Sequence, residues 1–466
     1  MSHRTYYSHT KAMTFDIHDP LYLNSTDLQS EFTRILDVCN GCRLCDGLCP
    51  SFNNVFDRIE EEDDKLSAAG HGKENPVRQL TKTDYDNVVD FCYQCKLCYP
   101  KCPYTPPHEY MLDFPRLLLR ADAIKAHDEG KTIKQKIRDE ITGDTDRAGA
   151  IAALAPGLAN WGATNTLART ALEAVAGIDK RKKLPEYAKE TFHHWFAKWA
   201  AGSPPTTREF DVTIPQTPDP KPQPEKVALF YTCMIDQNKP WIGKQYVEIL
   251  KHFGIEVVVP EQECCGMPEL GAAKLSKVTA SIDRNIERFL PFVESGYKII
   301  AMSPSCSMML RLDQADYATN KENARKVMAA VMDPCEYLMK LYRAKKIDFE
   351  WKASIGEKIT YHAPCHLRVQ NIGFNSRDLM KMIPGVTVTM VQQCSGHDGA
   401  WSSKKEYYEI SLDVGKKLFK AIEKDKPALV AGDCTLAHLH IEEGTGEESL
   451  HPIEVIYKAM GLPRVV

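Results

Sequence analysis

The chain has 466 residues, of which 43% are hydrophobic and 26% charged, a composition typical of a globular protein with two or three domains. A formal net charge of −4 excludes the strongly basic surface that binds nucleic acid. Without an 18-residue apolar run or the features of a signal peptide, we expect a cytoplasmic protein. Its sixteen cysteines therefore indicate metal ligation rather than disulfides, which are rare in reducing compartments.

An N-terminal extension, residues 1–34, precedes two cysteine tetrads that each have the spacing C-x2-C-x2-C-x3-C-P. This is the bacterial spacing for 4Fe–4S clusters, in which the fourth cysteine of each run ligates the other cluster. We therefore assign one cluster to Cys39, Cys42, Cys45 and Cys102, and the other to Cys92, Cys95, Cys98 and Cys49. A pair of zinc sites is the alternative, but zinc normally takes two pairs of ligands.

The proline after each tetrad suits the first position of a helix, so we expect the fourth cysteine to begin the next helix. Residues 35–110 are predicted to form an alpha-helical ferredoxin domain with two 4Fe–4S clusters, and residues 111–201 a further helical region. Residues 202–225 are rich in proline and are predicted to form a linker.

The helical region contains an aromatic stripe at i, i+3, i+4 and i+7, formed by Phe192, Trp195, Phe196 and Trp199. Packing against the protein itself or another subunit is the first interpretation, and contact with a membrane interface is the alternative. His193 and His194 are expected at the surface, and the basic run at residues 177–185 is expected to be a solvated or docking surface.

Residues 226–345 and 357–462 repeat one order of strands and helices. In the first unit, strands are predicted at 226–233, 255–260 and 297–306; in the second, at 358–365, 386–391 and 428–434. Alternating strands and helices indicate mainly parallel sheets, which gather ligands at the carboxyl ends of the strands. The predicted fold class is thus α+α/β, with a helical ferredoxin domain followed by tandem cysteine-rich units in a pseudo-twofold repeat.

Each unit brings cysteines to one rim of its sheet. The first unit offers a full set of four for a third iron–sulfur cluster or a zinc ion: Cys233, Cys264, Cys265 and Cys306. The second offers three candidates for a second centre or for catalysis: Cys365, Cys394 and Cys434. His366, His397 and His438 lie beside these three in sequence and could complete the site. Loss of the metal is the alternative for either unit, and Cys335 is interpreted as structural.

The double tetrad, the sequence CPYTPPHEYMLDFPRLLLRA and the tandem C…CCG…C units resemble a family of iron–sulfur electron-transfer subunits. That family includes the C subunit of anaerobic glycerol-3-phosphate dehydrogenase, the D subunit of heterodisulfide reductase and the iron–sulfur subunit of glycolate oxidase. The resemblance implies electron transfer from a flavoprotein towards quinone or another carrier. The partner that it implies is a flavoprotein dehydrogenase subunit or a rubrerythrin-like protein. It also implies the inner face of the cell membrane as an alternative location.

The chain departs from the heterodisulfide-reducing relatives, which carry two complete CCG runs, each unit ending in C-x2-C. Here Ser-Met-Met follows Cys306, Thr-Leu-Ala follows Cys434, and Ser395 interrupts the second CCG. Heterodisulfide chemistry is therefore not expected. The sequence also lacks a nucleotide-binding fingerprint, which places any flavin on a partner chain. Two alternative functions remain: a reductase of a disulfide, sulfur compound or peroxide centred on the second unit, and a docking module without metal there.

Overall fold

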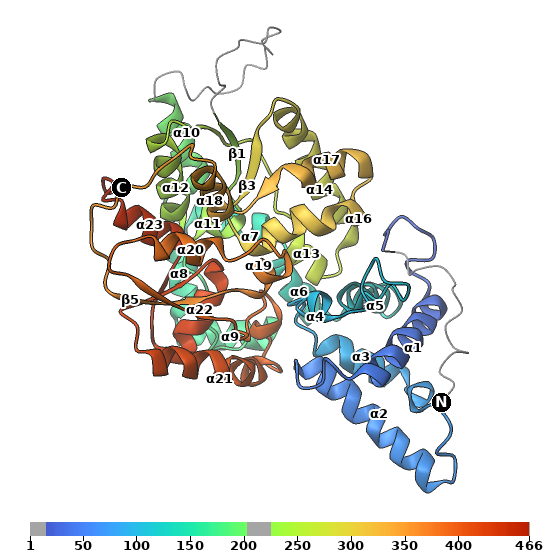
Figure 1. The fold of residues 1–466 in the computed structure, drawn as a ribbon. Helices are drawn as coiled ribbons and strands as arrows, with labels where there is room; N and C mark the ends of the chain where they lie inside the picture. Colours follow the sequence, from blue (N-terminus) through green and yellow to red (C-terminus); the bar gives the residue numbers. More distant parts are fainter. Residues whose placement is uncertain (1–14, 203–224, 466) are drawn as a thin grey trace. The chain divides into compact units, whose positions relative to one another are not determined.

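The computed structural model describes residues 15–202 and 225–465. The chain forms two compact units, one holding residues 1–132 and 273–275 and the other residues 133–272 and 276–466 (Figure 1). Nearly all of the predicted linker at 202–225 lies outside the described residues. No helix in the described part of the chain is long and apolar enough to cross a membrane.

The N-terminal unit is helical, as predicted for the ferredoxin region. Its helices are α1 (Ser25–Cys42), α2 (Pro50–Ala68), the 3-10 helix η2 (Pro76–Gln79), α3 (Lys82–Asp90), α4 (Cys98–Lys101) and α5 (Phe114–Asp128). Side chains cap four of them: Asn24 caps α1, Asn75 caps η2, Thr81 forms a capping box with Asp84 on α3, and Asp113 caps α5. One apolar core joins α1, α2, α3 and α5, and several cysteines of the two tetrads pack against its edge.

The two tetrads end differently. Cys49 is the N-cap residue of α2 and Pro50 is the first residue of that helix, as the sequence predicts. Cys102 instead follows the last residue of α4, and turns lead from Pro103 to the start of α5 at Phe114. The prediction that the fourth cysteine begins a helix is therefore wrong for the second tetrad, where the turns return the chain to the cluster region.

The second unit begins with five helices, α6 (Ile133–Thr142), α7 (Thr145–Leu154), α8 (Pro156–Thr164), α9 (Thr166–Ala176) and α10 (Phe192–Ala201). The aromatic stripe lies on α10. Phe192 and Phe196 are buried in the core with α12 (Pro240–His252), and Trp195 and Trp199 pack against the same core. The stripe therefore packs against the protein itself, which excludes it as a free membrane-binding face.

The first cysteine-rich domain contains a four-stranded parallel sheet in the order β2-β1-β3-β4. Its strands are β1 (Lys226–Phe230), β2 (Glu256–Val258), β3 (Lys298–Ala301) and β4 (Val331–Met332). Its helices are α11 (Cys233–Gln237), α12, α13 (Met267–Gly271), α14 (Leu275–Glu294), α15 (Pro304–Met308), the π-helix η3 (Met309–Asp313), α16 (Gln314–Tyr317), α17 (Lys321–Ala330) and α18 (Pro334–Arg343).

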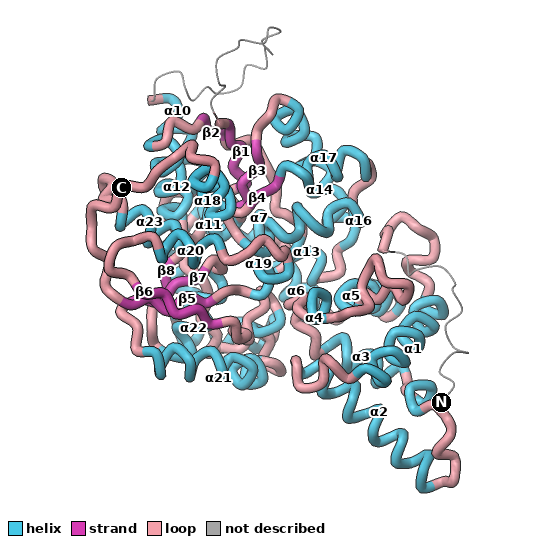
Figure 2. The backbone as a smooth tube through the Cα atoms, viewed as in Figure 1, coloured by secondary structure: helices cyan, strands magenta, loops and turns pink. Residues whose placement is uncertain are grey.

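The second cysteine-rich domain repeats this topology, with a parallel sheet in the order β6-β5-β7-β8 (Figure 2). Its strands are β5 (Lys358–His362), β6 (Thr387–Val391), β7 (Leu429–Gly432) and β8 (Ser449–Leu450). Its helices are α19 (Cys365–Val369), α20 (Asn375–Lys381), the 3-10 helix η4 (Trp401–Ser403), α21 (Tyr408–Asp425), α22 (Thr435–Thr445) and α23 (Pro452–Ala459).

The strands predicted from sequence exist, but they stop before the cysteines. β1 ends at Phe230 and β5 at His362, and Cys233 and Cys365 are instead the first residues of α11 and α19. The cysteines thus occupy the strand-to-helix turns at the carboxyl ends of the strands, where parallel α/β sheets gather ligands. The two-residue strands β4 and β8 were not predicted, because strands of this length carry no alternating pattern.

Candidate metal centres

In the N-terminal unit, one cavity gathers four thiols. Cys49 from the first tetrad lines it together with Cys92, Cys95 and Cys98 from the second. The other lining residues include the apolar side chains of Leu48, Phe52, Phe114 and Pro115. Four thiols in a mostly apolar cavity are a fitting environment for an iron–sulfur cluster.

The remaining four thiols of the tetrads are electrostatic neighbours. Burial raises the pKa of Cys39, and Cys45, Cys102 and Cys42 raise it further. Burial likewise raises the pKa of Cys45 to about 11, although the nearby Lys101 ammonium acts in the opposite direction. This second group contains the residues that the sequence assigns to the other cluster. Because a metal binds thiolate rather than thiol, buried cysteines of this kind release their protons when a cluster binds.

Hydrogen bonds to sulfur are present in both groups of the N-terminal unit. Gln94 Nε2 donates to Cys92 Sγ at 3.5 Å, and the Tyr104 amide donates to Cys102 Sγ at 3.4 Å. Gln94 is held in place by a second bond to the Pro115 carbonyl at 3.3 Å. Bonds of this kind tune the reduction potential of a bound cluster, because they stabilise electron density on sulfur.

The first cysteine-rich domain brings its four thiols into one buried chain of contacts. Hydrogen bonds join Cys233 to Cys264, Cys264 to Cys265 and Cys265 to Cys306. Thr145 Oγ1, from α7, donates to Cys264 Sγ at 3.4 Å. Hydrogen bonds from Cys233, Cys265 and Thr145 lower the pKa of Cys264. The hydrogen bond to Cys264, together with burial, raises the pKa of Cys233 and that of Cys265. All four predicted ligands of this domain thus lie together.

Two carboxyl groups accompany these thiols. Asp146 Oδ2 accepts a hydrogen bond from the Cys264 amide at 2.6 Å, and Glu269 lies at the start of α13. Burial and the nearby Cys264 raise the pKa of Asp146 to about 7 and that of Glu269 to about 8. Sequence analysis missed both groups. Asp146 is more than a hundred residues away in the chain, so only the packing of α7 brings it to the CCG run.

The second cysteine-rich domain places its three thiols after β5, β6 and β7, at positions equivalent to those of the first. Burial, followed by Cys394 and Cys434, raises the pKa of Cys365. In the CSG run, the Gly396 amide donates to Cys394 Sγ at 3.3 Å, and a Cβ on Gly396 would lie 1.9 Å from the Ser411 carbonyl oxygen. Glycine is therefore required there, as its φ of 73° also indicates.

The two cysteine-rich domains meet near their thiols. Ser305 Oγ, beside Cys306, lies 2.8 Å from His366 Nδ1, beside Cys365. Burial raises the pKa of Cys434, and Cys306 of the first domain adds to the shift. α15 and α19, which carry Cys306 and Cys365, pack against each other. Two centres in these domains would therefore be neighbours.

The three histidines that the sequence associates with the second set have different partners. His366 bonds to Ser305, His438 Nε2 lies 2.7 Å from the Gly432 carbonyl oxygen, and His397 Nδ1 lies 3.2 Å from Ser402 Oγ. His362 and His440, which the sequence analysis did not single out, are also buried in this domain. Their burial depends on tertiary packing, so the sequence contains no local signal for it.

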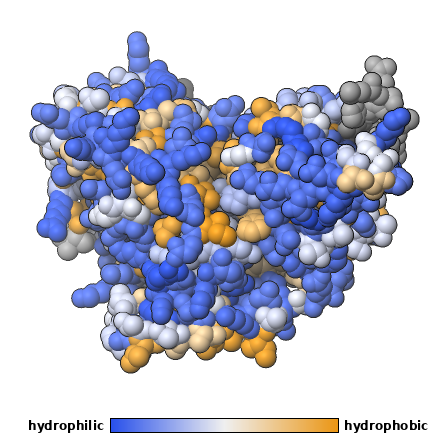
Figure 3. Space-filling view, turned by 90° about the horizontal axis from the view of Figure 1, so that it is seen from below, coloured by the Kyte–Doolittle hydropathy of each residue, from blue (hydrophilic) through white to orange (hydrophobic). Residues whose placement is uncertain are grey.

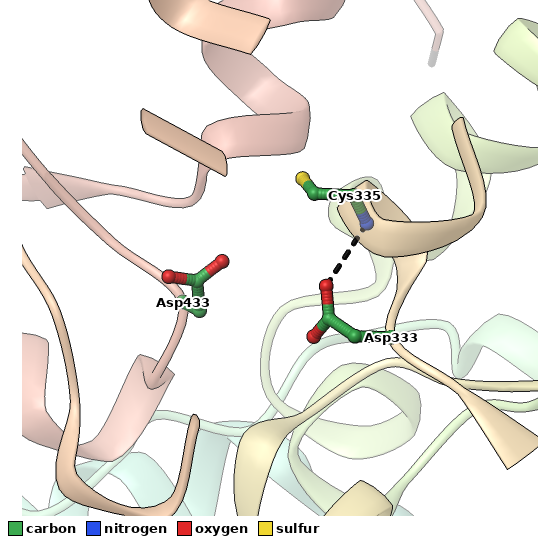
Figure 4. A group of neighbouring side chains, drawn as sticks. All are labelled: Asp333, Cys335 and Asp433. Carbon is green, nitrogen blue, oxygen red and sulfur yellow. Dashed lines mark hydrogen bonds between the residues drawn. The ribbon is translucent and has the colours of Figure 1, made fainter. Parts of the chain in front are cut away.

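Asp333, Cys335 and Asp433 form a buried group in which one ligand atom from each lies within 4.8 Å of the others (Figure 4). Asp433 accepts hydrogen bonds from Tyr361 and Ser376, and Asp333 Oδ1 accepts from the Cys335 amide at 3.0 Å. Burial and Asp433 raise the pKa of Asp333, which favours its protonated form. With its carboxyl oxygens already bonded to protein donors, the group is best described as a polar contact between the two cysteine-rich domains. The structural role of Cys335 stays a prediction, which its complete burial supports.

The basic run at 177–185 is exposed at Lys180, Arg181 and Lys183, as expected, but not at Lys182. Lys182 is 4% exposed, and its ammonium donates to Glu443 Oε2 at 2.6 Å. His193, expected at the surface, is half-buried and its Nδ1 lies 2.8 Å from Asp236 Oδ1. In both places an acidic partner distant in sequence accounts for the burial.

Comparisons with known proteins agree with this arrangement. Residues 32–129 match the Citrate utilization protein B Fer4-like domain, and residues 227–311 and 359–442 match the Cysteine-rich domain CCG. The chain is 27% identical over 418 residues to the C subunit of anaerobic glycerol-3-phosphate dehydrogenase of Escherichia coli, covering 80% of this chain and 99% of that protein.

The chain is also 26% identical over 417 residues to the B subunit of fumarate reductase (CoM/CoB) of Methanothermobacter marburgensis, covering 86% of this chain and 78% of that protein. Lactate utilization protein A of Bacillus licheniformis is 26% identical over 245 residues, which cover 50% of this chain and 97% of that protein. The resemblance inferred from the cysteine motifs is thereby confirmed for the C subunit of anaerobic glycerol-3-phosphate dehydrogenase.

Proposed function

Because the chain carries a Fer4-like domain and two CCG domains and is homologous to these dehydrogenase and reductase subunits, we propose that it is an electron-transferring iron–sulfur subunit of a flavin-linked oxidoreductase complex. The observation that supports this proposal most strongly is the cavity lined by Cys49, Cys92, Cys95 and Cys98. It supports the interlocked ligation that distinguishes a pair of 4Fe–4S clusters from a pair of zinc sites.

The chain's own residues have defined roles in this proposal. The two interlocked sets of tetrad cysteines hold the 4Fe–4S clusters, and Cys233, Cys264, Cys265 and Cys306 hold a third centre. Clusters bound there supply one-electron transfer, which a two-electron flavin donor on a partner subunit requires. Gln94 and Tyr104 donate hydrogen bonds to sulfur, and apolar side chains such as Phe52 and Phe114 exclude water.

The cross-ligation is tested by replacing the fourth cysteine of each tetrad in the full chain, purified without oxygen. Cys102→Ser and Cys49→Ser should each disturb a different cluster, seen by electron paramagnetic resonance (EPR) as loss of the coupling between two reduced clusters. Cys335→Ala, which removes a buried thiol outside the ligand sets, should leave that coupling intact. If both serine variants keep a coupled two-cluster signal, the assignment is wrong.

A reductase that uses a free thiol nucleophile in the second domain is less well supported. Burial raises the pKa of Cys365 and of Cys434, so both are protonated at neutral pH when no metal is bound, and thiols are poor nucleophiles. The partner is proposed to be a flavoprotein subunit, and a rubrerythrin-like protein is the alternative. Capturing the native complex through this chain and identifying the co-purifying flavin or di-iron protein separates the two.

We also propose that residues 148–168 place the chain on a membrane surface, where quinone is met. These 21 residues contain no charged side chain. They form parts of α7 and α9 and the whole of α8, and Leu154, Leu167 and Leu158 are 86%, 81% and 67% exposed. Figure 3 shows exposed hydrophobic side chains gathering along the lower edge of the face it draws. Patches of this kind mark interaction sites.

The composition of this segment favours a bilayer over a protein partner. Trp161 is 56% exposed, and tryptophan is enriched at membrane–water interfaces. Alanine, which is depleted in protein interfaces, makes up much of the rest together with glycine. Two bonds between Asn160 and the backbone of Tyr187 hold α8 in place, with Leu158 and Trp161 exposed.

Flotation of the full chain with vesicles that contain anionic lipid tests this surface. The double variant Leu154→Glu/Leu158→Glu should lose binding, whereas Ile133→Glu, which alters an equally exposed residue outside the segment, should not. If the wild-type chain does not bind vesicles, or if the double variant binds vesicles normally and loses only its protein partner, the membrane assignment is overturned.

A further inference from the structure

Four histidines in the second cysteine-rich domain each have one buried ring nitrogen without a hydrogen-bond partner. The nitrogens are His362 Nδ1, His397 Nε2, His438 Nδ1 and His440 Nε2. Buried polar atoms normally find partners, so each orphaned nitrogen calls for an explanation. Those of His397 and His440 belong to neighbouring rings, and together they indicate a group that the protein itself does not supply.

His440 has the surroundings of a metal ligand. It is 0% exposed, and its Nδ1 lies 2.7 Å from Glu443 Oε2. Lys182 Nζ lies 2.7 Å from the same nitrogen and also donates to Glu443. If Lys182 donated to Nδ1, the Nε2–H of His440 would be a buried donor without an acceptor. The tautomer with Nδ1–H bonded to Glu443 avoids this and leaves a lone pair on Nε2, as in carboxylate–histidine–metal arrangements.

His397 presents a second imidazole to the same region. Its ring centroid lies 6.0 Å from that of His440, and its Nδ1 is near Ser402 Oγ, which leaves Nε2 buried and unpartnered. A neutral imidazole with an unpartnered ring nitrogen is able to ligate a metal. With metal–nitrogen bonds of about 2 Å, two imidazoles at this separation can reach one metal or two adjacent ones.

The repeat explains why imidazole is needed here. In the first domain the CCG run supplies adjacent thiols, Cys264 and Cys265, followed by a glycine. In the second, Ser395 stands in place of Cys265. A serine hydroxyl is a weaker ligand for an iron–sulfur cluster than a cysteine thiolate. His397 follows the second glycine directly, at the position that Met267 occupies in the first domain. The domain that lacks a thiol therefore has an imidazole next to the gap.

We propose that the second cysteine-rich domain binds an iron–sulfur centre with mixed ligation, using the Nε2 atoms of His397 and His440 together with Cys365, Cys394 and Cys434. This inference rests on the proposed function for the presence of a metal in the domain. Among the described residues, the one group of three potential ligand atoms within 4.8 Å of one another is the Asp333 group. The second-domain set is spaced more widely, which suits a cluster better than a single ion.

Mixed ligation would give this centre a reduction potential different from those of the other centres. Replacing thiolate by neutral imidazole removes negative charge from a cluster and raises its potential, as in two-iron centres with two histidine ligands. The second domain would then hold the highest potential of the chain and form the accepting end of the relay.

Pulsed EPR on the full chain, purified without oxygen and reduced stepwise, tests the proposal. The centre that is reduced at the highest potential should show magnetic coupling to nitrogen, and labelling the protein with ¹⁵N-histidine should change that coupling. His397→Gln or His440→Gln should remove part of it and shift the reduction of this centre to lower potential. His451→Gln, in the same domain but with its Nδ1 accepting a hydrogen bond from the Ile453 amide, should preserve both properties.

The isotope experiment needs no variant, so misfolding of a glutamine variant does not affect its result. Absence of a histidine-dependent coupling in every reducible centre overturns the proposal, as does a coupling that neither His397→Gln nor His440→Gln reduces. Zinc as the only metal in the domain, with or without nitrogen neighbours by X-ray absorption, also overturns it. The coupled signal of the N-terminal clusters is recorded in the same samples, so failure of the proposed function would be seen separately.

Discussion

The two cysteine-rich domains share one topology but present different chemistry at the same edge of the sheet. Both have four parallel strands in the same order, and both place cysteines after their first three strands. The first domain surrounds four thiols with Asp146 and Glu269, whereas the second combines three thiols with buried imidazoles. The fold therefore determines where ligands gather, and single substitutions such as Ser395 for cysteine determine what they can hold.

The largest expected effect is loss of the first-domain centre in Cys264→Ser. Cys264 bonds to two other thiols and to Thr145, so its removal breaks the ligand set at its middle. Metal analysis should show loss of the metal of that centre, with the N-terminal clusters unaffected. A complementary change, Ser395→Cys at the position equivalent to Cys265, should increase metal content in the second domain. An unchanged metal content in Cys264→Ser would contradict the ligand assignment.

Removal of the buried ion pair should destabilise the second domain strongly. Lys182 and Glu443 have side chains only 3% and 7% exposed, so Lys182→Met leaves a buried carboxylate without its partner. Breaking a buried pair in this way costs about 3–5 kcal/mol. The control Lys183→Met removes an exposed pair with Glu442 and should change the free energy of unfolding by at most about 1 kcal/mol. Denaturant unfolding measures both, and equal effects would refute the role given to Lys182.

Charge near the first-domain thiols should affect the potential of their centre. Asp146 accepts a bond from the Cys264 amide, so Asp146→Asn removes a carboxyl group beside the cluster site. Less negative charge favours the reduced state, and the potential should rise by tens of millivolts in a redox titration. Glu140→Gln changes an exposed carboxyl group on α6 and should leave the potential unaltered. A fall in potential for Asp146→Asn would contradict this account.

The smallest expected effect concerns the contact between α10 and α11. A hydrogen bond to Asp236 raises the pKa of His193 above 6.5, so the folded state binds a proton more tightly than the unfolded state. This stabilisation is complete below pH 6.5 and is lost as the pH rises through the higher pKa of the folded state. Between about pH 8 and pH 6, the thermal midpoint of wild type should rise by about 1 °C more than that of His193→Gln. His194→Gln, altering the neighbouring imidazole, should behave as wild type.

The spacing of the cysteines predicted more of the fold and of the candidate metal sites than the overall composition did. Spacing placed Cys49 with Cys92, Cys95 and Cys98, and the repeat placed Cys365, Cys394 and Cys434 at the ends of parallel strands, because both depend on local chain geometry. Asp146, Lys182 and the Asp333–Asp433 contact could not be predicted in the same way. Each is buried by a partner far away in the chain, and a polar residue gives no sign in sequence of the partner that will compensate its burial.

The most direct test of the central claim is the iron and acid-labile sulfide content of the full chain, purified without oxygen, combined with EPR of the reduced protein. We predict more than about eight irons per chain with matching sulfide, a coupled two-cluster signal and at least one further signal from the cysteine-rich domains. Zinc in place of iron, with no acid-labile sulfide and no signal on reduction, would contradict an electron-transfer role.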